Sequence, residues 1–184
     1  APLPAGDRDY SWDQAKEIVL AAYGEFHPRL AELAGWFFER RWIDAPPRPG
    51  KYGGAFSHGA VPSVHPYILL NYDAKPRDVM TLAHELGHGV HQSLSGVRGL
   101  LQADTPLTTA ETASVFGEML VFRSMMANEP DAAVRLGMLT QKIEDSFATA
   151  FRQISMNRFE HAIHTARREE GELTAGRFGE LWLE

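Results

Sequence analysis

Residues 84–91, HELGHGVH, match the pattern H-E-x-x-H that zinc metalloproteases place on a helix. In a helix with about 3.6 residues per turn, His84 and His88 lie one turn apart on the same face, so both imidazoles can bind one ion. Glu85 is rotated by about 100° from His84, which places it beside such an ion, where it suits a base acting on a zinc-bound water. Because three specified residues also occur by chance, an amphipathic helix rich in histidine is the alternative.

A third ligand would decide between these interpretations, because catalytic zinc sites use three protein ligands and leave one position for water. The sequence has no cysteine, so the ligand must be His, Asp or Glu. The downstream candidates are Asp104, Glu111 and Glu118. Glu111 lies in TTAETASVFGE (108–118), among alanines that predict a packed helix face. A carboxylate on such a face is costly unless it is paired, and a zinc ion would offset that cost.

The apolar periodicity predicts a mainly helical chain with a small sheet. Ser11 and Gln14 form the pattern of a capping box at the start of the first helix. Proline and glycine between Ala45 and Pro66 exclude a continuous helix there. We expect helices over 11–24, from His27-Pro28 to before Ile43, over 76–96, over 107–128, from Pro130-Asp131 to about Glu170 and from Thr174 onward, and strands over 54–57 and 67–72.

Composition excludes several classes of protein. The 184 residues suit one domain, and 44 % apolar with 23 % charged residues is ordinary globular usage. A net charge of −6 provides no basic surface for nucleic acid or an anionic membrane. No apolar run approaches the roughly 18 residues of a membrane span, and residues 1–10 lack a basic region followed by an apolar stretch, so we expect neither export nor membrane insertion. The absence of cysteine fits a cytoplasmic protein.

Longer stretches resemble one family of enzymes. HELGHGVH followed by AETASVFGEML (110–120) resembles the zinc core of the thimet oligopeptidase and oligoendopeptidase F family, nearest to the oligoendopeptidase F branch. PGKYGGAFSHG (49–59) and VHPYILLNYDAKPRDVMTLAHELGHG (64–89) are also similar to that branch, so the resemblance covers roughly residues 50–184. It implies a zincin-like helical catalytic core with a small β-sheet, and one Zn²⁺ per chain held by His84, His88 and Glu111.

The resemblance also implies an activity, which is endopeptidase cleavage of short peptides. Glu85 would accept a proton from the zinc-activated water and return it to the leaving amine. Peptide substrate lies along an edge strand in the family, which carries over to Gly54 and Ala55. Zinc-bound imidazoles usually donate their other N–H to a carboxylate or carbonyl, so Ser114 and Glu118 are candidate second-shell partners, with plain solvation as the alternative. His91 is a further candidate contact or a polar helix position.

The sequence departs from the family in one respect. Family members stabilise the oxyanion with His and Tyr residues well after the third ligand, whereas all five tyrosines here precede the zinc motif. The downstream His161 and His164 lie in a different motif, FEHAIHTARREEGE. We therefore expect residues 1–184 to form a single partial peptidase catalytic domain. The alternatives are an inert zinc-binding fragment, which self-associates through apolar surfaces exposed by truncation, and a metallocarboxypeptidase.

Overall fold

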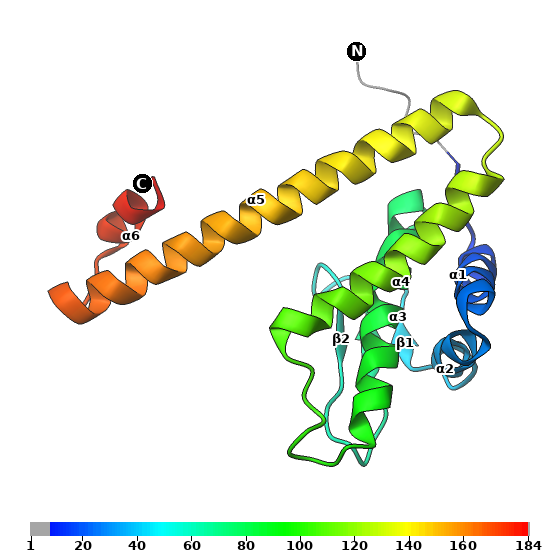
Figure 1. The fold of residues 1–184 in the computed structure, drawn as a ribbon, viewed down its shortest axis with the longest axis horizontal. Coiled ribbons are helices and arrows are strands. Elements are labelled where there is room, and N and C mark those ends of the chain that lie inside the picture. Colours follow the sequence, from blue (N-terminus) through cyan, green and yellow to red (C-terminus); the bar gives the residue numbers. More distant parts are fainter. Residues whose placement is uncertain (1–7, 184) are drawn as a thin grey trace. The chain divides into compact units, whose positions relative to one another are not determined.

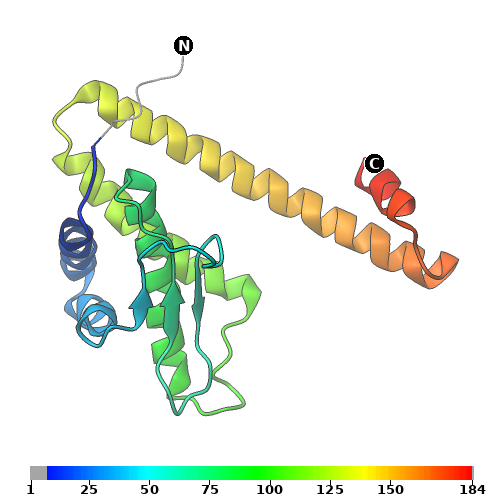
Figure 2. The same cartoon turned by 180° about the vertical axis from the view of Figure 1, so that it is seen from behind.

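The structure, a computed structural model, describes residues 8–183, which are mainly helical with one small sheet (Figures 1 and 2). This confirms the predicted fold class. Contacts divide the described residues into two compact units, residues 8–132 and residues 133–183. The single partial domain expected from the sequence stays a prediction. In chain order the elements are α1 (Trp12–Phe26), α2 (Pro28–Glu39), β1 (Ile43–Asp44), β2 (Phe56–His58), β3 (Tyr67–Leu69), α3 (Pro76–Gly96), α4 (Leu107–Asn128), α5 (Ala132–Glu170) and α6 (Ala175–Trp182).

Helix α1 begins with the predicted capping box. The backbone N–H of Gln14 donates to Ser11 Oγ over 3.2 Å, and the N–H of Ser11 donates to Gln14 Oε1 over 2.8 Å. Two of the four N–H groups that a helix start leaves unpaired are thus satisfied. The next helix, α2, follows with Pro28 in its first turn and His27 Nδ1 accepting from the N–H of Arg29. These side chains explain why the chain can break and restart within two residues.

The sheet has the order β1-β3-β2, with β1 parallel and β2 antiparallel to β3. Both predicted strands exist, but their bounds differ: β2 starts two residues later than expected, and β3 ends at Leu69. Strand β1 was not predicted, because a two-residue strand has no periodicity to detect. It forms because the N–H groups of Ile68 and Leu70 donate to the carbonyls of Trp42 and Asp44.

Helix α3 organises the first unit. It packs against α4, α1 and α2, and also against β2 and β3. Its buried side includes Val79, Leu82, Ala83, Leu86 and Val90, each at helical spacing. Helix α3 is therefore held from several sides by the core.

None of the helices in the described part of the chain has the length and hydropathy of a membrane span.

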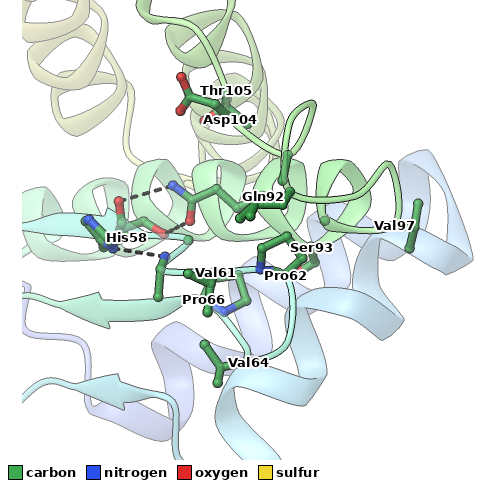
Figure 3. A pocket seen from close by; sticks show the side chains of 16 residues that line it. His58, Val61, Pro62, Val64, Pro66, Gln92, Ser93, Val97, Asp104 and Thr105 are labelled. Atoms are coloured by element: carbon green, nitrogen blue, oxygen red, sulfur yellow. Dashed lines mark hydrogen bonds between the residues drawn. The ribbon is translucent and has the colours of Figure 1, made fainter.

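A cavity of about 460 Å³ lies beside the second half of α3 (Figure 3). It is bordered by the segment 57–66, which contains the end of β2 and the loop after it, and by the loop between α3 and α4. Gln92, Ser93 and Gly96 contribute the helix side of its lining. The close-up shows Gln92 between these two loops, hydrogen-bonded to the segment that ends β2.

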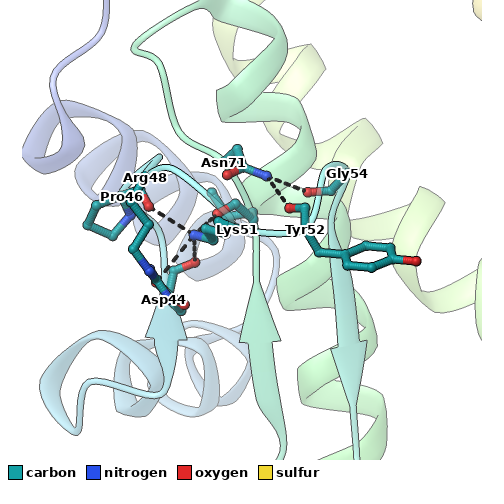
Figure 4. Close-up of polar contacts among 8 residues, drawn as sticks. Asp44, Pro46, Arg48, Lys51, Tyr52, Gly54 and Asn71 are labelled. Atoms are coloured by element: carbon teal, nitrogen blue, oxygen red, sulfur yellow. Dashed lines mark hydrogen bonds and ion pairs between the residues drawn. The ribbon is translucent and has the colours of Figure 1, made fainter.

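Lys51 joins the sheet to the loop that precedes β2 (Figure 4). Its side chain is 2 % exposed, and Nζ lies 2.6 Å from the carbonyl oxygen of Leu70, 2.9 Å from that of Asp44 and 3.1 Å from that of Pro46. Hydrogen bonds from Arg48 lower the pKa of Asp44 to about 2, and Lys51 lowers it further against the opposing effect of desolvation. A single buried ammonium thus connects β1, β3 and the loop.

The second unit consists of α5 and α6. Arg177 on α6 donates to Glu170 at the end of α5 over 2.8 Å, and Phe159 packs edge-on against Trp182 at 5.0 Å between ring centroids. Large apolar side chains on α5 are exposed at helical spacing: Leu136, Leu139, Ile143, Phe147, Phe151 and Ile154. The predicted self-association through apolar surfaces stays a prediction.

Replacement of Lys51 by Met should destabilise the first unit. The substitution keeps most of the buried stem and leaves the backbone carbonyls without their charged donor, which should cost about 2 to 3 kcal/mol of unfolding free energy. The matched control is Lys75→Met, because the Lys75 side chain is 58 % exposed and pairs with Asp9. That change should cost below about 1 kcal/mol. Urea denaturation measures both, and equal losses would show that Lys51 is not a structural link.

Candidate metal centre

Helix α3 presents His84 and His88 on one side, away from its buried face. Its start is fixed by Asp78, whose carboxylate accepts from the N–H groups of Asp73 (2.8 Å) and Lys75 (3.0 Å). The two imidazoles lie with ring centroids 4.9 Å apart and nearly perpendicular. As predicted from the spacing, the helix brings both rings to one place.

Glu111 on α4 meets both histidines. Its Oε2 lies 3.2 Å from His84 Nε2 and 3.5 Å from His88 Nε2, and one potential ligand atom from each of the three residues lies within 4.8 Å of the others. The side chain of Glu111 is 59 % exposed, so the expectation that it lies on a packed face was wrong. The neighbouring Ala110 is the buried residue, and the next position along the helix is rotated by about 100°.

The two distances from Glu111 to the imidazoles fit a tetrahedral ion. Zinc binds imidazole nitrogen and carboxylate oxygen at about 2.0–2.2 Å, so two ligands of one tetrahedral ion lie about 3.3 Å apart. The distances from Glu111 to the two imidazoles are 3.2 Å and 3.5 Å. Two neutral imidazoles and one carboxylate are also a ligand set that leaves a coordination position open. The residues present therefore fit a catalytic zinc ion.

Ser114 and Glu118 lie next to these groups on α4. Glu118 Oε2 is 3.2 Å from His84 Nδ1, the ring nitrogen that faces away from Glu111. Ser114 is fully buried, and its Oγ donates to Glu111 Oε2 over 2.8 Å. Burial lowers the pKa of His84, but the hydrogen bond to Glu118 and the charges of the nearby carboxylates outweigh it, so the pKa is raised overall. The contacts orient one imidazole and one carboxylate of the candidate ligand group.

Glu85 lies beside the group and is 6 % exposed. Burial raises the pKa of its carboxyl to about 7, with His84 lowering the pKa and Glu111 raising it. A carboxyl with a pKa near neutrality can both accept and return a proton at physiological pH. The arrangement therefore places a proton acceptor next to a potential metal site.

The site depends on an unusually close approach of α3 and α4. A Cβ atom on Gly87 would lie 2.7 Å from the carbonyl oxygen of Ala113 and from the Cα of Ser114. One turn further along the same side of α4, the Tyr23 hydroxyl occupies the position that a side chain at Gly117 would take, 3.4 Å from the carbonyl oxygen of Ala83 on α3. This hydroxyl donates to the carbonyl of Ala83 over 2.7 Å. Sequence reasoning did not identify Gly87, Gly117 or Tyr23, because their roles arise only when the helices meet.

The remaining predicted positions lie elsewhere. Gly54 and Ala55 directly precede the edge strand β2, and the carbonyl of Gly54 accepts from Asn71 Nδ2 over 3.1 Å. His91 is on α3, and its Nδ1 atom is buried without a hydrogen-bond partner among residues 8–183. The structure thus brings six of the predicted residues together (His84, Glu85, His88, Glu111, Ser114 and Glu118), while Gly54 and Ala55 belong to the segment that leads into β2.

Comparisons with known proteins agree on one family. The profile described as peptidase family M3 matches residues 20–183. The chain is 31 % identical over 187 residues to the group B oligopeptidase PepB of Streptococcus agalactiae, covering 100 % of this chain and 30 % of that protein. It is 38 % identical over 160 residues to an oligoendopeptidase F homolog of Borreliella burgdorferi, covering 84 % of this chain and 26 % of that protein. It thus spans about three tenths of these relatives.

The fold is also similar to that of a solved peptidase structure. PZ peptidase A, solved with an inhibitor, superposes with a TM-score of 0.76 at 20 % identity, over 98 % of this chain and 31 % of that chain. At this level of identity the similarity concerns the fold alone.

Substitution of Gly87 by Ala should separate α3 from α4. The added methyl group meets backbone atoms that cannot rotate away, so we expect a loss of about 1 to 3 kcal/mol in stability and weaker Zn²⁺ binding. Gly96→Ala on the same helix is the control, because a Cβ there has no atom within 4 Å. That variant should be neutral or more stable by up to about 1 kcal/mol. Thermal unfolding and zinc titration measure both, and unchanged zinc affinity in Gly87→Ala would contradict this role.

Proposed function

Because the chain belongs to peptidase family M3, we propose that it carries the zinc-binding part of the catalytic centre of an oligoendopeptidase. The observation that carries the proposal is the convergence of His84, His88 and Glu111, whose ligand atoms lie within 4.8 Å of one another. The substrates would be short peptides, because two relatives of this chain are named oligopeptidases. The cytoplasmic location expected from the sequence stays a prediction.

The three ligand residues would hold Zn²⁺, and a bound zinc ion acidifies water and polarises the carbonyl of the peptide bond. Glu118 would hold the His84 ring in the orientation that directs Nε2 to the ion, and Ser114 would do the same for the Glu111 carboxylate. Because these contacts already restrict the two side chains, the ligands lose less conformational freedom when they bind the metal. They support Ser114 and Glu118 as positioning residues.

Glu85 would act as the general base. It is adjacent to a ligand in sequence, nearly buried, and close enough to His84 and Glu111 for both charges to change its pKa. Because its pKa lies near 7, its carboxylate can take a proton from water and then give it to the leaving amine. Cleavage of the peptide bond needs both transfers.

The second candidate is a chain that holds zinc without turnover. Residues 76–184 contain no tyrosine, a residue type that stabilises the oxyanion in the resembled family. Loss of one such stabiliser typically costs about 100- to 1,000-fold in rate. Metal binding and cleavage therefore have to be measured separately on this chain.

The test of the base is Glu85→Gln, which preserves shape and removes the proton acceptor. We expect unchanged zinc content and a loss of at least about 100-fold in cleavage of a quenched fluorescent peptide. Equal cleavage by both proteins would show that Glu85 is not the base. If the parent chain holds zinc and never cleaves, the inert zinc-binding candidate is correct.

The ligand assignment predicts an order of zinc affinities. Glu111→Gln should weaken zinc binding by more than about 100-fold, because it removes a ligand, and Glu118→Gln should weaken it by about 10- to 100-fold through His84. Asp104→Asn is the control, since Asp104 is outside the ligand group. Competition with a chromophoric chelator measures all three variants. Wild-type affinity in Glu111→Gln would exclude Glu111 as the third ligand.

A further inference from the structure

The free edge of β2 is accessible to another extended chain. The N–H of Ile68 donates to Trp42, so the backbone groups of Ile68 face β1 and not β2. Ser57 lies opposite Ile68 in the antiparallel pair, and its N–H and C=O therefore face the free edge of the sheet. Because these directions alternate along a strand, the backbone groups of Ala55 face the same edge.

Gln92 closes this edge at Ser57. The Ser57 hydroxyl donates to Gln92 Oε1 over 2.8 Å, and Gln92 Nε2 donates to the Ser57 carbonyl over 3.2 Å (Figure 3). Gln92 is on α3, one helical turn after His88. A peptide that pairs with the backbone of Ala55 thus finds that the Ser57 carbonyl already accepts a hydrogen bond from Gln92. The peptide has to turn away from β2 at this residue.

The cavity beside α3 begins at the same point. Ser57 and Gln92 belong to its lining, and its loops contribute apolar side chains, Val61, Pro62, Val64, Val97 and Leu100. Val97 and Leu100 are 83 % and 72 % exposed, so most of their apolar surface at the rim of the cavity contacts solvent. Figure 3 shows Val61, Pro62 and Val97 around the space next to Gln92. An apolar group entering it would cover these side chains.

We propose that this cavity binds an apolar side chain of the peptide substrate, two to four residues before the cleaved bond. The inference rests on the proposed peptidase function. Gln92 lies about 6 Å and Gly96 about 12 Å beyond His88 along α3, and an extended peptide advances about 3.3 Å per residue. A peptide residue in the cavity is therefore about two to four residues away from the bond at the metal.

The direction follows from β2. This strand runs toward the cavity, because Ser57 contacts Gln92 and the following residues Ala60 and Val61 line the cavity. A peptide added antiparallel, the slightly more stable arrangement, runs from the cavity toward the metal ligands. The side chain in the cavity therefore precedes the bond at the metal.

Peptide hydroxamates provide the test, because the hydroxamate binds zinc and fixes the register. In acetyl-pentaalanine hydroxamates, one Leu replaces Ala at each of the positions one to five residues before the hydroxamate. By calorimetry with the zinc-loaded chain, we expect peptides with Leu two to four residues before the hydroxamate to bind about tenfold more tightly than those with Leu at the other positions. Leu100→Asp should abolish this preference. Leu101→Asp is the matched control, since Leu101 is 96 % exposed and outside the lining, and it should preserve the preference.

The outcomes separate the two proposals. If hydroxamates bind equally whatever the position of Leu, or if Leu100→Asp keeps the preference, the cavity proposal is overturned while the metal centre stands. If no hydroxamate binds the zinc-loaded chain, the proposed function fails together with the cavity. A preference found only in the reverse series, with the hydroxamate at the amino end of the peptide, would overturn the antiparallel direction.

In Gln92→Ala the preference for Leu should spread to neighbouring positions, and an unchanged pattern would contradict the role of Gln92.

Discussion

The contact between Gly87 on α3 and the backbone of Ala113 and Ser114 on α4 is the constraint on which the candidate site depends. Side chains normally keep two helix axes about 8 to 10 Å apart, and the missing Cβ lets these backbones touch. Ser114 and Glu111 are three residues apart, on the same face of α4. Closing the gap at Ser114 therefore brings the carboxylate of Glu111 above His84 and His88. Tyr23 supports the arrangement by filling the space that Gly117 leaves and by binding the carbonyl of Ala83.

The close helix contact also concentrates charge. Glu85, Glu111 and Glu118 all act on the pKa of His84, and Glu111 raises the pKa of Glu85 in addition to the effect of its burial. Three carboxylates around two imidazoles repel one another unless a cation or protons compensate them. A divalent cation at the position defined by the ligand atoms would remove that repulsion. The helix packing that brings the candidate ligands together thus also creates the negative charge that would attract a metal ion.

Much of the fold and of the candidate site could be predicted from the sequence, and the wrong or missing predictions have identifiable physical causes. The helices of the motif and the convergence of His84 with His88 follow from a period of 3.6 residues, which acts locally. Glu111 was found through its motif, but its exposure was predicted wrongly, since neighbouring alanines do not show which way a helix faces. Strand β1, the buried Lys51 and the hydroxyl of Tyr23 were missed. Tyr23 and Ala83 are 60 residues apart, and no pattern within a short window encodes such a contact.

Helix α3, which carries the candidate ligands His84 and His88, also positions the sheet edge. Gln92 connects α3 to Ser57, so the distance between the candidate ligands and β2 is set by hydrogen bonds from one rigid element. Lys51 fixes the other side by holding the segment before β2 to the carbonyls that end β1 and β3. A peptide on this edge would meet a scaffold whose spacing is already determined before binding. Because ordering costs are then smaller, a short peptide with few side-chain contacts can still be held in one register.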